Sequence, residues 1–235
     1  MTIEAAIFDV FGTVVDWRRG VAEAVAPAFA ARGIALAPER FADAWRAEYQ
    51  PGMAPIRAGT RGYTPLDVLH RENLDRALVA CGLGEIFDGP ERDALNTAWE
   101  KLPPWPDSVP GIAAMRRRLL VAPCSNGSIA LMARLARFGG LEWDAILGAE
   151  IAQTYKPEPE VYLRAAAALR LPPGQVVMVA AHNDDLAAAR AAGLATAFVP
   201  RPAEHGPGQR SDLAPEADWD FVAPEMTALA ERLAG

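Results

Sequence analysis

The sequence is poor in cysteine and in basic residues, and each shortage excludes a class of protein. Only two cysteines occur, Cys81 and Cys124, and neither belongs to a Cys-x-x-Cys pair. A disulfide framework and a zinc site of that type are therefore excluded, and we expect both thiols to be small buried hydrophobes. Lysine and arginine number 23 against 30 acidic residues, a net charge of -7. Such a chain has no basic field for nucleic acid or for an anionic membrane.

Long apolar runs are also missing. No stretch of about 18 apolar residues occurs, which argues against a transmembrane helix. The N-terminus begins with a strand-like segment instead of the basic and apolar regions of a signal peptide, so we expect a cytoplasmic protein. Hydrophobic residues nevertheless make up 51% of the 235 positions. That share suffices for one substantial core and a smaller accessory unit.

Apolar periodicity divides the chain into a short strand, a helical stretch and a longer alternating region. Residues 5–10 form an apolar run that ends at a Gly-Thr pair, which predicts a buried strand. From residue 16 to 95 the spacing of apolar residues is helical, interrupted by a Pro- and Gly-containing segment, 51–65, that we expect to be a loop.

Strands and helices alternate through the rest of the chain. Short strands are predicted at 120–124, 145–147, 176–181 and 195–199, with helical patterns between them. This alternation predicts an α/β fold with a Rossmann-like parallel sheet. We expect a core domain of residues 1–15 and 96–235, and an inserted helical cap domain of residues 16–95.

Ligands of open parallel sheets bind beyond the carboxyl ends of the strands, so polar residues there are the candidates. Asp9 ends the first strand and is the candidate nucleophile, and Ser125 and Asn126 follow a later strand. Alone, the Ser-Asn-Gly turn is typical of a helix start, and a lone lysine such as Lys156 is typical of a surface. Their order along the chain, with an acidic pair ending at Asp185, favours a common site.

In these motifs the chain resembles the haloacid dehalogenase superfamily. The matching segments are residues 8–13 (Phe-Asp-Val-Phe-Gly-Thr), Ser125–Gly127, Lys156-Pro157, and Asp185 ahead of residues 189–193. The resemblance spans essentially the whole chain. It implies a Rossmann-like core with a cap and a nucleophilic Asp9.

Within the superfamily the chain is most similar to the (S)-2-haloacid dehalogenases of the L type. Phe11-Gly12-Thr13 resembles their aromatic replacement of the phosphatase pattern Asp-x-Asp-x-Thr, and Tyr162 follows the lysine by six residues, as in that family. Trp45-Arg46 resembles the segment that carries a halide-binding arginine. The resemblance implies substrate-binding roles for Arg46 and Tyr162, and a homodimer.

The chemistry of halide displacement suits these residue types. Asp9 can attack the carbon that bears the halogen, giving an ester that water then hydrolyses. Lys156 would keep Asp9 ionised, and Asp185 would hold Lys156. Thr13 and Ser125 are candidates for binding the substrate carboxylate.

Arg46 and Asn126 suit the departing halide, as a cation and an amide donor. No cofactor is expected. Phe11 and Ala181 stand where magnesium-dependent members of the superfamily place carboxylates, so we expect no metal.

The fourth motif departs from the dehalogenase pattern Ser-Ser-Asn, because Ala180 and His182 replace its first and last residues. One hypothesis is that His182 activates the hydrolytic water. The alternative is a histidine that is only hydrogen-bonded at a strand end. Asp184 is interpreted as a helix-start carboxylate instead of a cation ligand, and His70 and His205 are expected to face solvent.

These expectations favour hydrolytic dehalogenation of short 2-haloacids or haloacetates to 2-hydroxy acids, through an ester on Asp9. Three alternatives stay open. They are a C-N hydrolase that opens a strained cyclic amino acid by the same ester chemistry, a magnesium-dependent phosphatase, and a catalytically silent binding protein that kept the fold.

Overall fold

A five-stranded sheet lies at the centre of the computed structural model, which describes residues 2–233. Its strands are β1 (Ala5–Phe8), β2 (Leu120–Pro123), β3 (Val176–Ala180), β4 (Ala195–Phe198) and β5 (Phe221–Val222). They follow the order β2-β1-β3-β4-β5, and every neighbouring pair is parallel. The predicted parallel α/β sheet is confirmed. All five carboxyl ends therefore meet at one edge.

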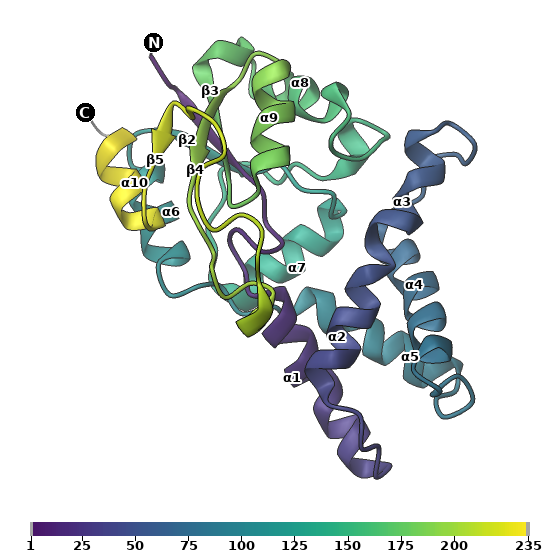
Figure 1. Cartoon of the computed structure of the whole chain (residues 1–235). Helices are drawn as coiled ribbons and strands as arrows, with labels where there is room; N and C mark the ends of the chain where they lie inside the picture. The colour runs from purple at the N-terminus through teal and green to yellow at the C-terminus, as the bar shows by residue number, and fades with distance from the viewer. Residues whose placement is uncertain (1, 234–235) are drawn as a thin grey trace.

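Helices cover both faces of the sheet (Figure 1). On one face lie α6 (Ser108–Arg116), α7 (Ile129–Gly139) and α10 (Met226–Leu233), and on the other α8 (Pro159–Ala168) and α9 (Asn183–Ala191). Successive strand residues point to opposite faces, so Ala6 and Phe8 pack in the first layer while Ala5 and Ile7 pack in the second. Three short 3-10 turns, Ala149–Ile151, Pro173–Gln175 and Gly206–Gly208, lie in the loops.

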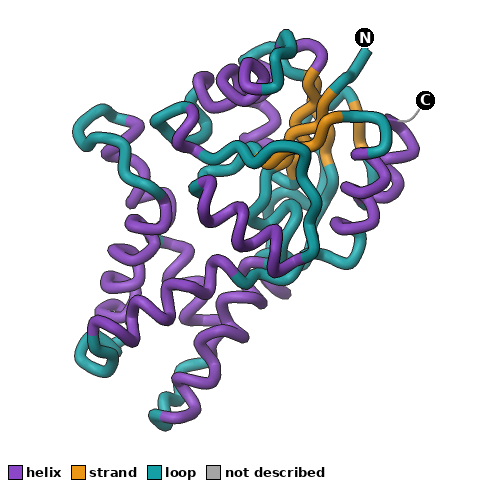
Figure 2. Tube along the Cα trace, turned by 180° about the vertical axis from the view of Figure 1, so that it is seen from behind, coloured by secondary structure: helices purple, strands orange, loops and turns teal. Residues whose placement is uncertain are grey.

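Between β1 and α6 the chain is helical. It forms α1 (Trp17–Ala31), α2 (Pro38–Ala47), α3 (Tyr49–Arg57), α4 (Leu66–Ala80), α5 (Gly89–Asn96) and the 3-10 turn η1 (Thr97–Glu100). These helices extend away from the sheet, on the side opposite the chain ends (Figures 1 and 2). The predicted helical stretch is confirmed, while the division into two domains at residues 15 and 96 stays a prediction. Within residues 2–233, every helix is too short or too polar to cross a lipid bilayer.

Four local predictions were wrong. Cys81, expected to be buried, is partly exposed at the end of α4. The expected loop at 51–65 is helical as far as Arg57. Pro51 lies in the first turn of α3, where a backbone N-H has no helical partner to lose, and the helix also accommodates Pro55 in its interior. The expected strand at 145–147 is a single bridge from Leu147 to Cys124. His70 is buried, not solvent-facing, since its ring stacks on Trp99 at a centroid distance of 4.1 Å.

Candidate active site

Side chains from four adjacent strand ends form the candidate site. Asn126 follows β2, Asp9 follows β1, His182 follows β3 and Glu204 follows β4, which is their order along the carboxyl edge of the sheet. Asp9 occupies a central place because β1 lies between β2 and β3. Its backbone N-H donates to the carbonyl of Val179 at 3.0 Å, which extends the ladder by one residue and fixes the carboxylate at the edge.

Each oxygen of the buried Asp9 carboxylate accepts hydrogen bonds from different partners. Lys156 Nζ donates to Oδ1 at 2.8 Å, whereas the Thr13 hydroxyl donates to Oδ2 at 2.7 Å. His182 Nδ1 lies 3.1 Å from the same Oδ2. Oδ1 thus accepts one hydrogen bond and Oδ2 accepts two.

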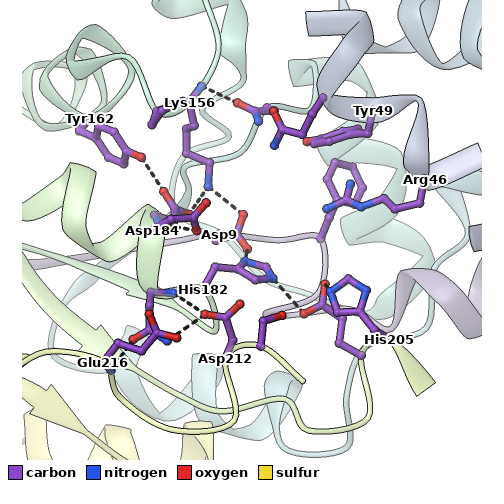
Figure 3. A pocket seen from close by; sticks show the side chains of 18 residues that line it. Asp9, Arg46, Tyr49, Lys156, Tyr162, His182, Asp184, His205, Asp212 and Glu216 are labelled. Atoms are coloured by element: carbon purple, nitrogen blue, oxygen red, sulfur yellow. Dashed lines mark hydrogen bonds and ion pairs between the residues drawn. The ribbon is translucent and has the colours of Figure 1, made fainter. Parts of the chain in front are cut away.

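Lys156 is itself held by a second carboxylate. Its Nζ lies 2.5 Å from Asp185 Oδ2, and the Tyr162 hydroxyl donates to Asp185 Oδ1 at 2.6 Å. The backbone N-H of Lys156 donates to Asn126 Oδ1 at 2.8 Å, which ties the lysine loop to the end of β2. The ammonium is therefore fixed between two buried carboxylates (Figure 3).

Charges within this cluster shift the acidities of its members. Burial opposes ionisation of Asp9, but Lys156 and the hydrogen bond from His182 outweigh it and hold the Asp9 pKa far below its usual range. Burial likewise disfavours a charged Lys156, yet Asp185 and Asp9 raise its pKa above the ordinary value. Burial and the charge of Asp9 raise the pKa of Asp185, against the attraction of Lys156. At neutral pH the candidate nucleophile is an anion.

His182 bridges Asp9 and Glu204 (Figure 3). Its Nε2 lies 2.9 Å from Glu204 Oε2, on the side of the ring opposite the contact with Asp9. Burial disfavours the imidazolium, but Glu204 and Asp9 together raise the pKa of His182 well above its ordinary value.

Glu204 is a buried carboxylate whose position is fixed by its neighbours. Only 1% of it is exposed, and the indole Nε1 of Trp17 donates to its Oε1 at 2.8 Å. Burial acts against its ionisation, but the neighbouring His182 lowers its pKa. Gly12 adjoins it: a Cβ atom on that residue would lie 2.1 Å from Glu204 Oε1.

A cavity of about 360 Å³ opens over Asp9. Arg46 reaches it from α2, its guanidinium 3.9 Å from the centre of the Tyr49 ring. Arg46 Nη1 is buried and has no hydrogen-bond partner among residues 2–233, and the residue as a whole brings a positive charge to the cavity wall. The other lining residues that matter here are Phe11, Asn126, Lys156, Tyr162, His182, Asp184, Asp185, Glu204 and Glu216.

Two predicted substrate-binding residues lie outside the cavity lining. Thr13 is fully buried, where its hydroxyl donates to Asp9 and accepts from the N-H of Ala181 at 2.9 Å. Ser125 Oγ accepts from the N-H of Gly127 at 3.1 Å. Both hydroxyls have structural partners, and contact of either with a substrate carboxylate stays a prediction.

The donor set around Asp9 differs from that of a magnesium site. Phe11, at the position of a second carboxylate, packs against Trp99 and Tyr49 at ring distances of 5.6 and 6.4 Å. Within residues 2–233 no group of three or more His, Cys, Asp or Glu side chains is arranged to hold a metal ion. Asp184 lies in the first turn of α9 and accepts from the N-H of Asp185, as interpreted from its position.

Sequence reasoning brought most of these side chains together but missed Glu204. The residue stands in a polar loop after β4, and a single carboxylate in such a loop gives no chemical signal. The strand order supplies the missing information, because β4 adjoins β3, whose end carries His182.

Three comparisons place the chain among known proteins. The family model of the haloacid dehalogenase-like hydrolases matches residues 3–193. The crystal structure of a defluorinating L-2-haloacid dehalogenase is 49% identical in sequence, with a TM-score of 0.97 over 99% of this chain and 96% of that one. A second L-2-haloacid dehalogenase structure is 43% identical, with a TM-score of 0.94 over 99% of both chains.

A curated relative agrees with these structures. The (S)-2-haloacid dehalogenase of Xanthobacter autotrophicus is 29% identical over 206 residues, which cover 85% of this chain and 76% of that protein.

Proposed function

The chain belongs to the haloacid dehalogenase-like hydrolases, and we propose that within this family it hydrolyses the carbon-halogen bond of short 2-haloacids or haloacetates, releasing a halide and a 2-hydroxy acid. The L-2-haloacid dehalogenases to which it is similar over nearly its whole length support this activity. One observation carries the proposal: a buried, ionised Asp9 lies at the base of a cavity that the cationic Arg46 also lines.

In the first step Asp9 attacks the carbon that bears the halogen. Oδ1 is the attacking oxygen, because it accepts one hydrogen bond, from Lys156, whereas Oδ2 accepts two. Lys156 keeps the carboxylate charged without occupying all of its lone pairs. The bond from Oδ1 to carbon forms as the carbon-halogen bond breaks, and the electron pair leaves with the halide.

Arg46 receives the departing halide. Its guanidinium is the cation at the cavity wall opposite the Lys156 pair, and its positive charge can attract an anion there. Asn126 also lines the cavity, but its Oδ1 is occupied by the backbone of Lys156, which leaves its amide N-H groups as donors. Helices α1–α5 act as the cap that brings Arg46 over the core.

In the second step water attacks the Asp9 carbonyl carbon and releases the 2-hydroxy acid. His182 takes part in this step, since it is the ring that contacts Asp9 from the side opposite Lys156. Neither step uses a metal in this proposal. Lys156 and His182 supply positive charge at both Asp9 oxygens, where a magnesium site would need free carboxylate oxygens.

The assay that tests this function measures halide release from chloroacetate, fluoroacetate and (S)-2-chloropropionate, with and without EDTA, beside a phosphate ester and a strained cyclic amino acid. We expect halide release that EDTA leaves unchanged. Phosphate release that EDTA abolishes, without halide release, would establish a phosphatase instead. Turnover of the cyclic amino acid alone would indicate the C-N hydrolase. Absence of turnover with every substrate would indicate a binding protein.

We also propose that the enzyme is a cytoplasmic homodimer, as the similarity to L-type dehalogenases suggests. Light scattering on the purified protein should give twice the chain mass of 25.1 kDa; a monomer at the same concentration would contradict the dimer. Fractionation of cells that express the protein tests its location.

A further inference from the structure

We propose that His182 serves the hydrolytic step as a charged hydrogen-bond donor to Asp9 Oδ2, not as the base that activates water, and that Glu204 is the positioning residue that keeps it charged. The inference rests on the proposed dehalogenation and concerns its second half. It assigns a role to a loop carboxylate that no sequence motif singles out.

The hydrogen-bond partners of His182 determine its protonation state. Nδ1 lies 3.1 Å from Asp9 Oδ2 and Nε2 lies 2.9 Å from Glu204 Oε2. An ionised carboxylate can only accept hydrogen bonds, so each contact requires a proton on the ring nitrogen. A ring that donates from both nitrogens is an imidazolium. It has no lone pair with which to take a proton from water.

The same contacts form a pair of donors for the developing negative charge. Once Oδ1 carries the substrate carbon, Oδ2 becomes the carbonyl oxygen of the ester. The Thr13 hydroxyl and His182 Nδ1 already point at this atom from 2.7 and 3.1 Å. Donors placed at that range before the reaction stabilise an oxyanion without reorganisation. Thr13 is held as a donor because its oxygen accepts from the N-H of Ala181.

Asp185 takes the proton of the attacking water in this scheme. Water adds to the Asp9 carbonyl carbon, its proton passes to Asp185, and the negative charge forms on Oδ2. When the intermediate collapses, the bond between the Asp9 carbonyl carbon and Oδ1 breaks, and Oδ1 leaves with the substrate as an alkoxide that takes a proton from Lys156. Asp185 then returns its proton to Lys156 over 2.5 Å. The regenerated Asp9 carboxylic acid releases one proton to solvent, which balances the reaction.

Glu204 is built into the site as a fixed negative charge. Its Oε1 accepts from Trp17 Nε1 at 2.8 Å, and its Oε2 is left to His182. Gly12 leaves the space that the carboxylate fills. A carboxylate so buried is costly unless a cation pairs with it, and His182 is the cation it contacts most closely among residues 2–233, with His205 Nε2 farther away at 3.6 Å.

The charges around His182 change when the ester forms. In the resting enzyme it faces Asp9 and Glu204, with Lys156 and Asp185 beyond Asp9, and His205 and Arg46 near Glu204. Esterification removes the charge of Asp9, so Glu204 alone then holds the ring proton. A donor role requires that proton, and hydrolysis of the ester should therefore slow as pH rises and His182 deprotonates.

A single-turnover experiment with chloroacetate tests the role. Rapid acid quench followed by mass spectrometry measures the ester on Asp9, and chloride is measured in parallel. Glu204→Gln should leave the chloride burst unchanged and lengthen the life of the ester about 10- to 100-fold, less than the roughly 100- to 1000-fold of a donor that is removed outright. Glu204→Asp should recover part of the rate. Glu85→Gln removes one negative charge from an exposed position outside the cavity, and should leave the ester lifetime unchanged.

The pH profile separates a donor from a base in the wild-type enzyme, without any variant. Ionisation of Asp185 raises the rate on the acid side of the profile; on the alkaline side the rate of ester hydrolysis should fall with rising pH, and the fall should begin at lower pH in Glu204→Gln. A rate that keeps rising on the alkaline side, or an ester lifetime that Glu204→Gln leaves unchanged, would overturn the proposal.

Nitrogen NMR of the free enzyme distinguishes failure of this inference from failure of the proposed function. The His182 ring, assigned by comparison with His182→Asn, should remain doubly protonated above the ordinary histidine pKa and lose a proton at lower pH in Glu204→Gln. A neutral His182 ring at pH 7 overturns the inference even if halide is released. An absent chloride burst beside a charged ring overturns the dehalogenase assignment instead.

Discussion

A Cβ atom on Gly12 would lie 2.1 Å from Oε1 of Glu204, a residue 192 positions away in the chain. Gly12 also has φ +92°, a conformation that side chains rarely adopt. The glycine of the opening motif thus does more than turn the chain after Asp9. It leaves room for the carboxylate that contacts His182.

Gly12→Ala should therefore destabilise the fold and slow turnover. Backbone strain of about 1–2 kcal/mol adds to overpacking of about 1–3 kcal/mol, so the free energy of unfolding in urea should fall by about 2–5 kcal/mol. Gly33→Ala is the matched control, since Gly33 has φ +63° but nothing within 4 Å of a Cβ atom. It should show the strain alone, and equal losses for both variants would contradict the clash with Glu204.

His182→Asn should separate the two chemical steps. The variant keeps a short polar side chain but loses the contact with Glu204 and the ring charge next to Asp9. We expect a chloride burst of one equivalent per site followed by turnover about 100-fold slower, because alkylation survives and ester hydrolysis does not. Intact-protein mass spectrometry should detect the ester. Undiminished steady-state turnover would remove His182 from the mechanism.

The dependence of stability on pH should report the charge on His182. Its pKa in the folded protein is raised above the ordinary 6.5, despite burial, by Glu204 and Asp9. The imidazolium therefore contributes stability that is fully present below about pH 6.5 and is lost as pH rises through the folded value. The difference in unfolding free energy between the wild type and His182→Asn should shrink from pH 6 towards alkaline pH. A difference that grows over this range would show that the ring is neutral when folded.

The sequence predicted the parts of the site that depend on strand ends, and missed those that depend on which strands are neighbours. Asp9 and Lys156 follow from motifs, and the alternation of elements correctly predicted a parallel sheet. The order of the strands in the sheet, however, cannot be predicted from a local sequence pattern. The proximity of Glu204 to His182 results from the pairing of β3 with β4, and a lone loop carboxylate gives no hint of it.

The burial of His70 was not predicted from the sequence. His70 looked like a surface residue because a polar side chain on a helix usually faces water. It is instead packed between Trp99 and Tyr49, with ring distances of 4.1 and 5.9 Å, and burial keeps its pKa low, with Arg46 adding to the effect. A histidine can replace an aromatic residue in such a stack, and the pattern of polar and apolar letters does not reveal it.

The two thiols should differ in reactivity for the same reason. Cys124 directly follows β2 and lies inside the core, and burial raises its pKa to about 12, so at pH 8 only about one molecule in ten thousand carries the thiolate. Cys81 is partly exposed at the end of α4. Iodoacetamide should label Cys81 alone in the folded protein, without loss of activity, and both thiols in urea. Rapid labelling of Cys124 in the native enzyme would show that the carboxyl edge opens to solvent.

The packing of Phe11 explains why a single substitution at this position should not convert the protein into a metal-dependent phosphatase. The ring lies edge-on to Trp99, His70 and Tyr49, at centroid distances between 5.6 and 6.4 Å. Phe11→Asp would remove these contacts and bury a carboxylate without a partner, at a cost of about 3–5 kcal/mol from the lost packing alone. Phe11→Leu keeps an apolar side chain there and should lose less than half as much in urea unfolding.

The same variant should gain no phosphatase activity. Even with a second carboxylate present, Lys156 and His182 still hold both oxygens of Asp9, and magnesium would have to displace a buried ammonium that is also paired with Asp185. Phe11→Asp should therefore hydrolyse a phosphate ester no faster than the wild type at millimolar magnesium. Magnesium-dependent phosphate release by this variant would mean that the residue at position 11, and not the cations around Asp9, decides between attack on carbon and attack on phosphorus.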